Sequence, residues 1–364
     1  MSVAASTPEA WATLSLKALP HQPLVALLRT FGGPAAVLAA TRAQLLAIVP
    51  EAIAARALEP VDLESLAATR RWLAEPAHEI VAWDDADYPR TLLDLGYAPP
   101  ALFFVGRREL LNRPALAIVG SRNATAQGAI NARAFASALS NAGLTIVSGL
   151  AIGIDAAAHE GALDCPGSTL AVVGTGLDRV YPARNRALAH RIAQHGGLLS
   201  EFPPGTPPRA MNFPRRNRLI SGLARGVLVV EAAVSSGSLI TARYAGEQGR
   251  EVFAIPGSIH SPLSKGCHKL IRDGAKLVET AQDILEELGM AAQHVTADKR
   301  AAGPSTDVEA SLLDALGGDT LDVDTLVSRT GMASEVVMAA LTGLELSGCI
   351  AAIPGGLWQR LHRA

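Results

Sequence analysis

The sequence is poor in cysteine, in aromatic residues and in long apolar runs. Its three cysteines, Cys165, Cys267 and Cys349, lie far apart with no paired spacing, which indicates neither a disulfide framework nor a cysteine-rich zinc site. No segment approaches the roughly 18 uninterrupted apolar residues of a membrane span, and no basic N-terminal region precedes an apolar run. We therefore expect a cytoplasmic protein with no membrane partner.

Several motifs of enzymes are missing as well. GxxxxGK[ST] does not occur, which removes the P-loop route to ATP hydrolysis, and no serine lies in a hydrolase elbow. The turn Gly174–Arg179 starts like a dinucleotide fingerprint but has Arg179 where the third glycine belongs, which weakens NAD binding. Asp155 and His159 lack a third ligand or a nucleophile, so we interpret them as packing and hydrogen-bonding residues. The sequence thus predicts no catalytic residue, metal site or cofactor.

Positive and negative charges nearly balance over the whole chain. The formal net charge is -2 and the isoelectric point is about 6.5, which argues against indiscriminate coating of nucleic acid but leaves room for one basic groove. Between Phe202 and Val230, however, there are five arginines and no acidic residue. Such a run indicates either an anion site or a solvated helix face.

What the chain does contain is apolar sequence in two patterns. With 364 residues, 49% of them hydrophobic, it is long enough for two or three domains. From Ala115 onward, short apolar runs without polar alternation are separated by helical stretches, which predicts an α/β fold with a mostly parallel sheet buried on both faces. The predicted strands are Ala115–Val119, Leu144–Val147, Thr169–Val173, Gly197–Ser200, Val227–Val230 and Glu251–Ile255, with a further one near Lys276–Val278.

The flanking regions differ from this centre. Leucine and alanine recur at helical spacing from Trp11 to about Trp72, with a Gly-Gly-Pro turn typical of SAM-like modules. We interpret Trp83–Val105 as a connector that packs on the domain after it, and three helical patterns with a hairpin after residue 307 as a winged helix. The predicted division is a helical SAM-like domain at 1–75, a connector and central domain at 76–290, a linker at 291–306 and a winged-helix domain at 307–364.

Small residues follow nearly every predicted strand. The turns are Gly120-Ser121-Arg122, Ser148-Gly149-Leu150, Gly174-Thr175-Gly176 and, after the strand at 227–230, Ser235–Ser238. Ligands of open α/β sheets bind beyond the carboxyl ends of the strands, so we expect these turns to line one crevice. At Arg122, either the turn holds an anion with backbone N–H groups and a guanidinium, or a tight turn carries a solvated arginine.

Arginines also lie in the first turns of two predicted helices. Arg184 opens one of them, and Arg215, Arg216 and Arg218 open the other. Cations at a helix N-terminus oppose the helix dipole, so a bound anion would relieve a local cost. Phe213, just before the second group, is either a stacking platform for a base or a core residue.

Taken together and in order, these motifs resemble the DprA/Smf family of DNA-processing proteins. The resemblance covers roughly Ala115–Leu277, and its flanks match in architecture only. It rests on GSR at 120–122, SGLA at 148–151 with Gly153, Ile154, Asp155 and His159, Tyr181-Pro182 with Asn185, FPRRNRLISGL at 213–223, SGSLITA at 236–242, and Pro256-Gly257 with Gly266 and HKLI at 268–271.

The resemblance implies an extended Rossmann-like domain that binds single-stranded DNA, forms a homodimer and loads the RecA recombinase in natural transformation, without turnover. It implies dimer and recombinase surfaces at roughly Ile259–Leu277. The predicted DNA-binding residues are Gly120, Ser121, Arg122, Ser148, Gly149, Gly174, Arg184, Asn185, Phe213, Arg215, Arg216, Asn217, Arg218 and Ser238.

Two other functions remain as hypotheses. One is a nucleotide-processing enzyme similar to phosphoribohydrolases, although Glu231–Thr241 lacks their PGGxGTxxE motif. The other is an adaptor that binds proteins only. If four or five arginines contact phosphates, log K for a single strand should fall with log salt at a slope near about -3.

Overall fold

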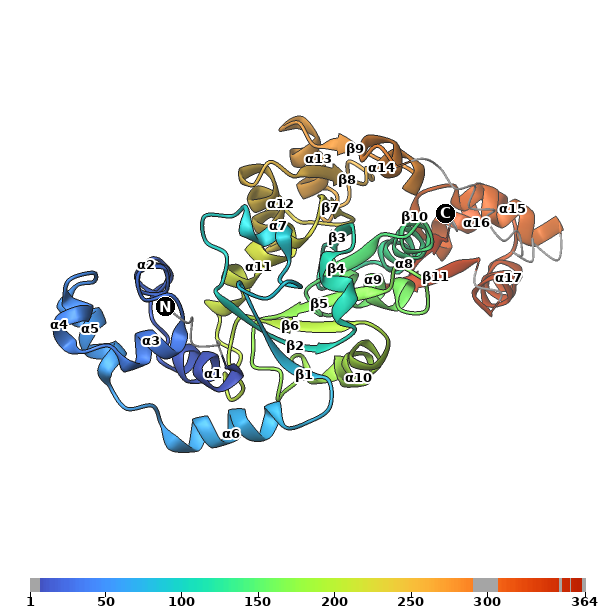
Figure 1. Cartoon of the computed structure of the whole chain (residues 1–364). Coiled ribbons are helices and arrows are strands. Elements are labelled where there is room, and N and C mark those ends of the chain that lie inside the picture. Colours follow the sequence, from blue (N-terminus) through green and yellow to red (C-terminus); the bar gives the residue numbers. More distant parts are fainter. Residues whose placement is uncertain (1–6, 291–306, 347–348, 354, 362–364) are drawn as a thin grey trace.

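The computed structural model describes residues 7–290, 307–346, 349–353 and 355–361. It has an α/β fold with a nine-stranded, mostly parallel sheet and a separate three-stranded sheet near the C-terminus (Figure 1). The predicted fold class is therefore confirmed. The predicted linker at 291–306 lies outside the described residues.

The N-terminal region consists of six short helices around a small apolar core. Trp11, Leu27 and Leu45 are buried in it, and the threonines and the aspartate before three of the helices cap their first turns. Gly32 ends the second helix in the left-handed conformation, which makes the predicted Gly-Gly-Pro turn a helix cap. The helices are α1 (Pro8–Leu16), α2 (His21–Phe31), α3 (Pro34–Ala39), α4 (Arg42–Leu46), α5 (Glu51–Leu58) and α6 (Leu63–Leu73).

The strands of the central sheet agree closely with the predicted ones. They are β3 (Ala115–Val119), β4 (Thr145–Ser148), β5 (Thr169–Val173), β6 (Gly197–Ser200), β7 (Gly226–Val229), β8 (Glu251–Ala254) and β9 (Lys276–Leu277). These strands are mutually parallel, in the order β6-β5-β4-β3-β7-β8-β9. Along the chain, β4, β5 and β6 are thus added in turn on one side of β3, and β7 then pairs with the other side of β3.

Helices cover both faces of this sheet (Figure 1). Alternate residues of β3 point to opposite faces: Leu116 and Ile118 pack with one helical layer, and Ala117 and Val119 with the other. The first layer contains α8 (Ala126–Asn141), α9 (Ile154–Ala162), α10 (Arg186–His195) and α14 (Ala281–Glu287), and the second contains α7 (Arg90–Leu93), α11 (Asn212–Leu223), α12 (Ser238–Glu247) and α13 (Lys265–Arg272). Short 3₁₀ helices lie at Arg108–Asn112 (η1) and Ala183–Asn185 (η2).

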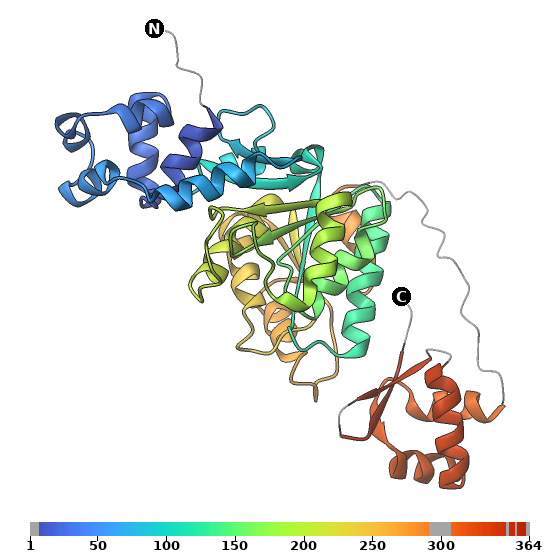
Figure 2. The same ribbon diagram turned by 90° about the horizontal axis from the view of Figure 1, so that it is seen from below.

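The predicted connector forms part of the central sheet. It contains β2 (Ala101–Gly106), and with β1 (His78–Ala82) it forms an antiparallel hairpin that extends the central sheet beyond β6. Phe103 and Phe104 of β2 point to opposite faces, the first into the N-terminal core and the second into the central core. The N-terminal helices therefore pack directly on the end of the sheet (Figure 2).

The C-terminal region has the predicted outline of three helices and a hairpin. They are α15 (Asp307–Leu316), α16 (Val323–Thr330), α17 (Ser334–Leu346), β11 (Ile350–Ile353) and β12 (Leu357–Arg360). The sequence did not indicate β10 (Thr320–Asp322), which pairs with β12. Across the part of the chain that the structure describes, no helix is both long and apolar enough to span a membrane.

Candidate nucleic-acid interface

The loops after β3, β4 and β5 meet at the carboxyl edge of the sheet. The amide of Ile154, which opens α9 after β4, donates to the carbonyl of Ser121 after β3 (3.1 Å). Asn212, at the start of α11, donates through its side chain to the carbonyl of Gly174 after β5 (3.0 Å). These bonds connect the loop after β3 with the loop after β4, and the loop after β5 with the start of α11. Three of the four turns predicted to line one crevice therefore lie at this edge, and the fourth, Ser235–Ser238, follows β7 and leads into α12.

A buried arginine lies beneath these loops. Arg216 Nη1 donates to the carbonyl of Gly149 (2.6 Å) and to that of Val172, so it ties α11 to the ends of β4 and β5. Asp155 Oδ2 accepts from the amides of Gly149 (3.1 Å) and Ala151 (3.3 Å). A Cβ atom on Gly149 would lie 2.7 Å from both side chains, so only glycine fits between them.

Burial sets the protonation of this pair. It lowers the pKa of Arg216 to about 10, with Asp155 opposing the shift, so the guanidinium stays charged at neutral pH. Burial raises the pKa of Asp155, against the pull of Arg216 and the two amides. Asn185 lies beside them and donates to the carbonyls of Leu150 (2.9 Å) and Ala151 (3.1 Å). We call Gly149, Asp155, Asn185 and Arg216 the floor.

Above the floor lies a group of side chains that we call the rim: the exposed Arg122, Tyr181 and Arg184, and the half-buried Phe213. The rings of Tyr181 and Phe213 lie 5.5 Å apart, and Tyr181 is 47% exposed. The guanidinium of Arg122 lies 6.0 Å from the centre of the Phe213 ring. Neither Arg122 nor Arg184 forms an ion pair with any residue in the described ranges.

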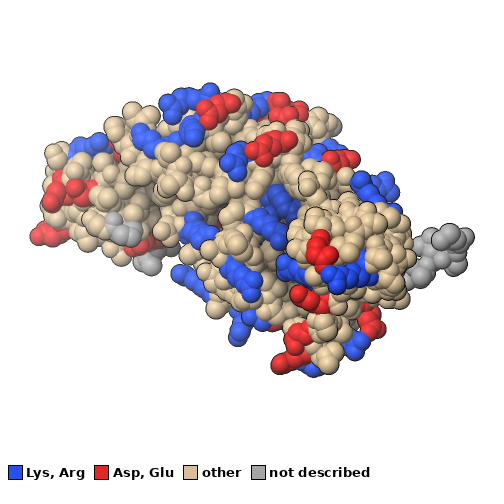
Figure 3. All heavy atoms as spheres, turned by 90° about the vertical axis from the view of Figure 1, so that its left-hand side faces the viewer, with Lys and Arg blue, Asp and Glu red and all other residues tan. Residues whose placement is uncertain are grey.

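The surroundings of Phe213 bear on its two predicted roles. The ring is half-buried and rests on Gly174, where a Cβ atom would lie 3.0 Å from it. The ring is thus not a core residue, and its neighbours on the exposed side are the guanidinium of Arg122 and the ring of Tyr181. Lys and Arg side chains gather around the middle of the face that looks left in Figure 1 (Figure 3).

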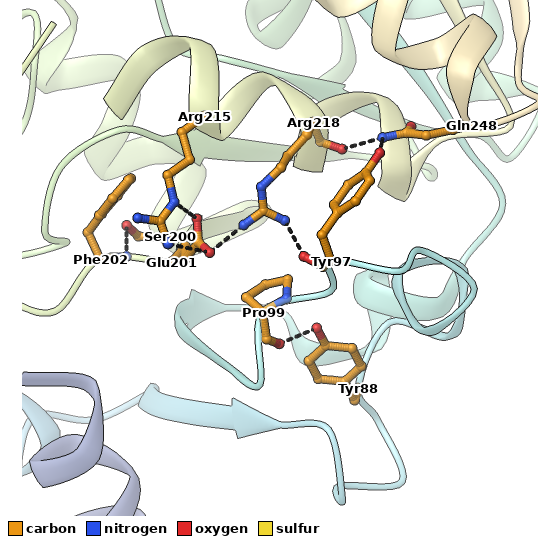
Figure 4. A network of polar contacts seen from close by, with 9 residues as sticks. All are labelled: Tyr88, Tyr97, Pro99, Ser200, Glu201, Phe202, Arg215, Arg218 and Gln248. Atoms are coloured by element: carbon orange, nitrogen blue, oxygen red, sulfur yellow. Dashed lines mark hydrogen bonds and ion pairs between the residues drawn. The ribbon is translucent and has the colours of Figure 1, made fainter. Parts of the chain in front are cut away.

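Two predicted arginines point away from the floor. Arg215 and Arg218 lie on the other side of α11 and share the carboxylate of Glu201, which directly follows β6 (Figure 4). Arg218 is 11% exposed and also donates to the carbonyl of Tyr97 (2.6 Å), whereas Arg215 is 53% exposed. Arg218 is therefore held in place by buried partners, whereas the side chain of Arg215 is about half exposed to solvent.

The remaining predicted residues are bonded within the protein. Ser148 Oγ donates to the carbonyl of Ile118 (2.6 Å), and Ser121 Oγ accepts from the amide of Asn123 (3.1 Å). Asn217 accepts from Arg216 (3.2 Å) through its side chain, and the hydroxyl of Ser238 lies 2.7 Å from that of Ser236. Gly120 directly follows β3 and packs on Ile154.

The start of α8 is occupied by a carboxylate of the protein itself. Glu231, two residues after the end of β7, accepts from the amide (2.9 Å) and the hydroxyl (2.5 Å) of Thr125, and its carboxylate lies against Gly128. β3 and β7 flank the point where the strand order reverses, the place where Rossmann-like proteins bind nucleotide phosphates. In this protein the positive end of the α8 dipole is already paired with the carboxylate of Glu231.

Asp155 and His159 do not form a pair. His159 is fully buried and its Nδ1 lies 2.7 Å from the hydroxyl of Thr169, while burial lowers its pKa to about 3. Within the described ranges, no three His, Cys, Asp or Glu side chains group as metal ligands.

Sequence reasoning missed Glu201 and Glu231 and gave Tyr181 no role of its own. The available signal was position, because Glu201 and Glu231 directly follow the predicted strands Gly197–Ser200 and Val227–Val230.

The chain is similar to several known proteins. A family model described as DNA recombination-mediator protein A matches residues 79–289, and one described as the DprA winged helix domain matches residues 296–356. Protein Smf of Escherichia coli is 44% identical over 308 residues, covering 83% of this chain and 82% of its own. The DNA processing protein DprA of Streptococcus pneumoniae is 52% identical over 203 residues, covering 56% of this chain and 72% of its own.

Two solved structures are similar as well. DNA processing protein A from Streptococcus pneumoniae is 40% identical with a TM-score of 0.68, covering 77% of this chain and 98% of that one. DNA processing protein A from Helicobacter pylori, described by its single-stranded DNA binding mode, is 31% identical with a TM-score of 0.52, covering 57% of this chain and 95% of that one.

Proposed function

Because this chain belongs to the DprA/Smf family of DNA-processing proteins, we propose that it binds single-stranded DNA along the rim. The observation that carries the proposal is the group formed by Arg122, Phe213 and Tyr181. It joins an exposed guanidinium, with no ion-pair partner among the described residues, to two neighbouring aromatic rings. A phosphate and a base of one strand need these two kinds of group side by side.

The proposed contacts are a subset of the residues predicted from sequence. Arg122 and Arg184 bind phosphates, Phe213 stacks a base, and backbone groups at Gly120, Ser121 and Gly174 line the path. Arg216, Gly149, Ser148 and Asn185 support it, since they are buried and bonded to the loops. Asn217, Arg218 and Ser238 have supporting roles for the same reason.

A single strand suits this site better than a duplex. A flexible strand can turn its phosphates and bases toward successive loop ends, whereas a duplex is stiff and keeps its bases stacked inside. Phosphate contacts carry no base information, so we expect little sequence preference. With Arg122 and Arg184 as the cations of the rim, two contacts give a slope of log K against log salt of about -1.4.

We extend the proposal to the cellular role that the family resemblance implies. The chain acts without turnover in the cytoplasm, forms a homodimer and loads the RecA recombinase onto single strands that enter in natural transformation. Its similarity to proteins named DprA supports this role. We also propose the domain division predicted from the sequence: a helical domain at 1–75, the connector and central domain at 76–290, a linker at 291–306 and a winged-helix domain at 307–364.

The nucleotide-processing alternative has less support. Glu231 fills the start of α8, so a nucleotide phosphate at the reversal of strand order would meet a carboxylate rather than a free helix end. An adaptor that binds proteins only would not account for the exposed arginines of the rim.

One experiment separates the three functions. Binding of a single strand, a duplex and a mononucleotide is measured across a salt series, and the mixtures are analysed for products. We expect salt-dependent binding of the single strand, weaker binding of the duplex and an unchanged mononucleotide. Free base released from the nucleotide would support the enzyme, and no binding of any nucleic acid would support the adaptor.

A further inference from the structure

The side of α11 that faces away from the floor carries more positive than negative charge. Arg215 and Arg218 share one carboxylate, that of Glu201, which is 7% exposed. Two guanidinium groups and one carboxylate leave one positive charge uncompensated, and no other acid of the described residues forms an ion pair with either arginine. A local excess of charge of this kind favours an anion.

Of the two arginines, only Arg215 can leave the carboxylate at low cost. Its Nε and Nη2 atoms donate to the buried carboxylate of Glu201 (3.0 and 2.9 Å), and its guanidinium lies 5.4 Å from the centre of the Phe202 ring. Its side chain is nevertheless 53% exposed, so a phosphate in solution can reach its guanidinium. Glu201 would keep Arg218 as a partner, so no buried carboxylate would be left unpaired. Arg218 is further held by the carbonyl and the ring of Tyr97 (Figure 4).

A cavity of about 210 Å³ lies next to these arginines, between α11 and the N-terminal helices. Its walls include Arg215 and Arg218 from α11, Tyr97, and the segment from Ala18 to His21 that leads into α2. The side chain of His21 is half-buried there. The cavity therefore combines two guanidinium groups with an imidazole, which are donors that suit a phosphate.

The cavity also lies within reach of the rim. Phe213 and Arg215 both belong to the first turn of α11 but point to different sides of it, since two helical residues this close differ by about 200°. A strand that stacks a base on Phe213 and crosses the start of α11 would pass Arg215 next. The start of this helix adds a positive dipole end along that path.

We propose that this cavity is a second phosphate subsite, which takes a phosphodiester of a single strand leaving the rim, and that Arg215 exchanges Glu201 for that phosphate. This inference rests on the proposed function, and it adds the N-terminal helices to the DNA path through His21.

The test compares strand lengths. Affinities of oligothymidylates from about 4 to about 16 nucleotides are measured across a salt series for the full chain and for Arg215→Ala. For long strands, the variant should lose one phosphate contact, so its salt slope should be less steep by about 0.7. For the shortest strands, which fill the rim alone, affinity and slope should stay as in the unchanged protein.

A matched control is available on the other side of the sheet. Arg133 of α8 is also about half exposed and ion-paired, with Glu160, so Arg133→Ala removes the same charge far from the cavity. We expect no length-dependent change in this variant. The subsite would be overturned if Arg215→Ala matched Arg133→Ala at every length, or if it weakened the shortest strands as much as the longest.

A pH series tests the part of His21. Burial and the charge of Arg218 lower its pKa, with Arg215 adding to this shift and Glu201 and the backbone of Gly96 opposing it. A phosphate favours the protonated imidazole, so long-strand affinity should rise as pH falls from about 7.5 to about 6, and short-strand affinity should rise less. His21→Gln should remove this difference. An unchanged difference in that variant would show that His21 takes no part.

Failure of this inference can be told from failure of the proposed function. If the unchanged protein binds no single strand, the proposed function is wrong and the subsite falls with it. If it binds strands of all lengths but the Arg215 variant shows no length dependence, only the second subsite is wrong.

Discussion

The floor and the rim of the interface contain the same residue type in opposite states. Arg216 in the floor is buried and bonded to two backbone carbonyls, whereas Arg122 in the rim is exposed above an aromatic ring. Both belong to motifs of the same family resemblance. The difference shows that an arginine near a binding site can serve the fold or the ligand, and that burial and partners decide which.

The largest expected effect concerns the floor. Arg216→Met keeps the apolar stem but leaves the buried Asp155 without its cation and two carbonyls without a donor. We expect the free energy of unfolding to fall by about 3–5 kcal/mol, as measured by urea denaturation. Arg122→Met should change it by less than about 0.5 kcal/mol. Equal losses in the two variants would remove the distinction between floor and rim.

The next effect concerns the aromatic part of the rim. Phe213→Ala should weaken single-strand binding by about 1–3 kcal/mol, because it removes the stacking surface next to Arg122. The measurement is a binding titration at fixed salt, with the unfolding midpoint recorded in parallel. Phe213→Tyr retains an aromatic face and should bind nearly as well as the unchanged protein. If the tyrosine variant binds as poorly as the alanine variant, stacking is not the role of this ring.

The buried side chain of His159 should make the stability of the protein depend on pH. Burial lowers the pKa of His159 to about 3 from its ordinary 6.5, so the unfolded chain takes up the proton first as pH falls. The stability due to the neutral imidazole is present above pH 6.5 and is lost as pH falls toward 3. Between about pH 7 and pH 5 this loss is about 2 kcal/mol.

Denaturation of the unchanged protein and of His159→Gln at several pH values measures this loss. The variant should be less stable at neutral pH but should lack this component of the pH dependence. Parallel pH curves for the two proteins would show that His159 is not the group responsible.

The smallest effect is expected at an exposed arginine outside the rim. Arg225 precedes β7, at the opposite edge of the sheet from the interface. Arg225→Ala should leave single-strand affinity unchanged within about twofold and stability within about 0.5 kcal/mol. A clear loss of affinity would mean that arginines bind DNA wherever they are exposed, and that the rim is not a defined site.

The parallel sheet could be predicted because its strands are apolar on both faces. Runs such as Leu116–Val119 and Leu170–Val173 have no polar alternation, and small residues directly follow them. β1 was missed because a five-residue segment with two polar residues at its start resembles many loops. The loop positions at the carboxyl edge followed from the strands alone.

The states of the arginines could not be predicted, because their partners come from elsewhere in the chain. The run of five arginines contains no acid only when it is counted from Phe202, and Glu201 is one residue earlier. The side of α11 that faces Glu201 is decided by packing against the sheet and Tyr97, which the sequence pattern does not encode. Similarly, Thr125 and its partner Glu231 are 106 residues apart.

The central claim is that exposed rim arginines, and not buried ones, bind the phosphates. It is tested most directly by the salt dependence of single-strand binding in the unchanged protein and in the double variant Arg122→Ala/Arg184→Ala. For long strands, where Arg215 adds one contact to those of Arg122 and Arg184, we predict a slope of log K against log salt of about -2 for the first and about -0.7 for the second, with equal unfolding midpoints. An unchanged slope in the double variant would contradict the claim.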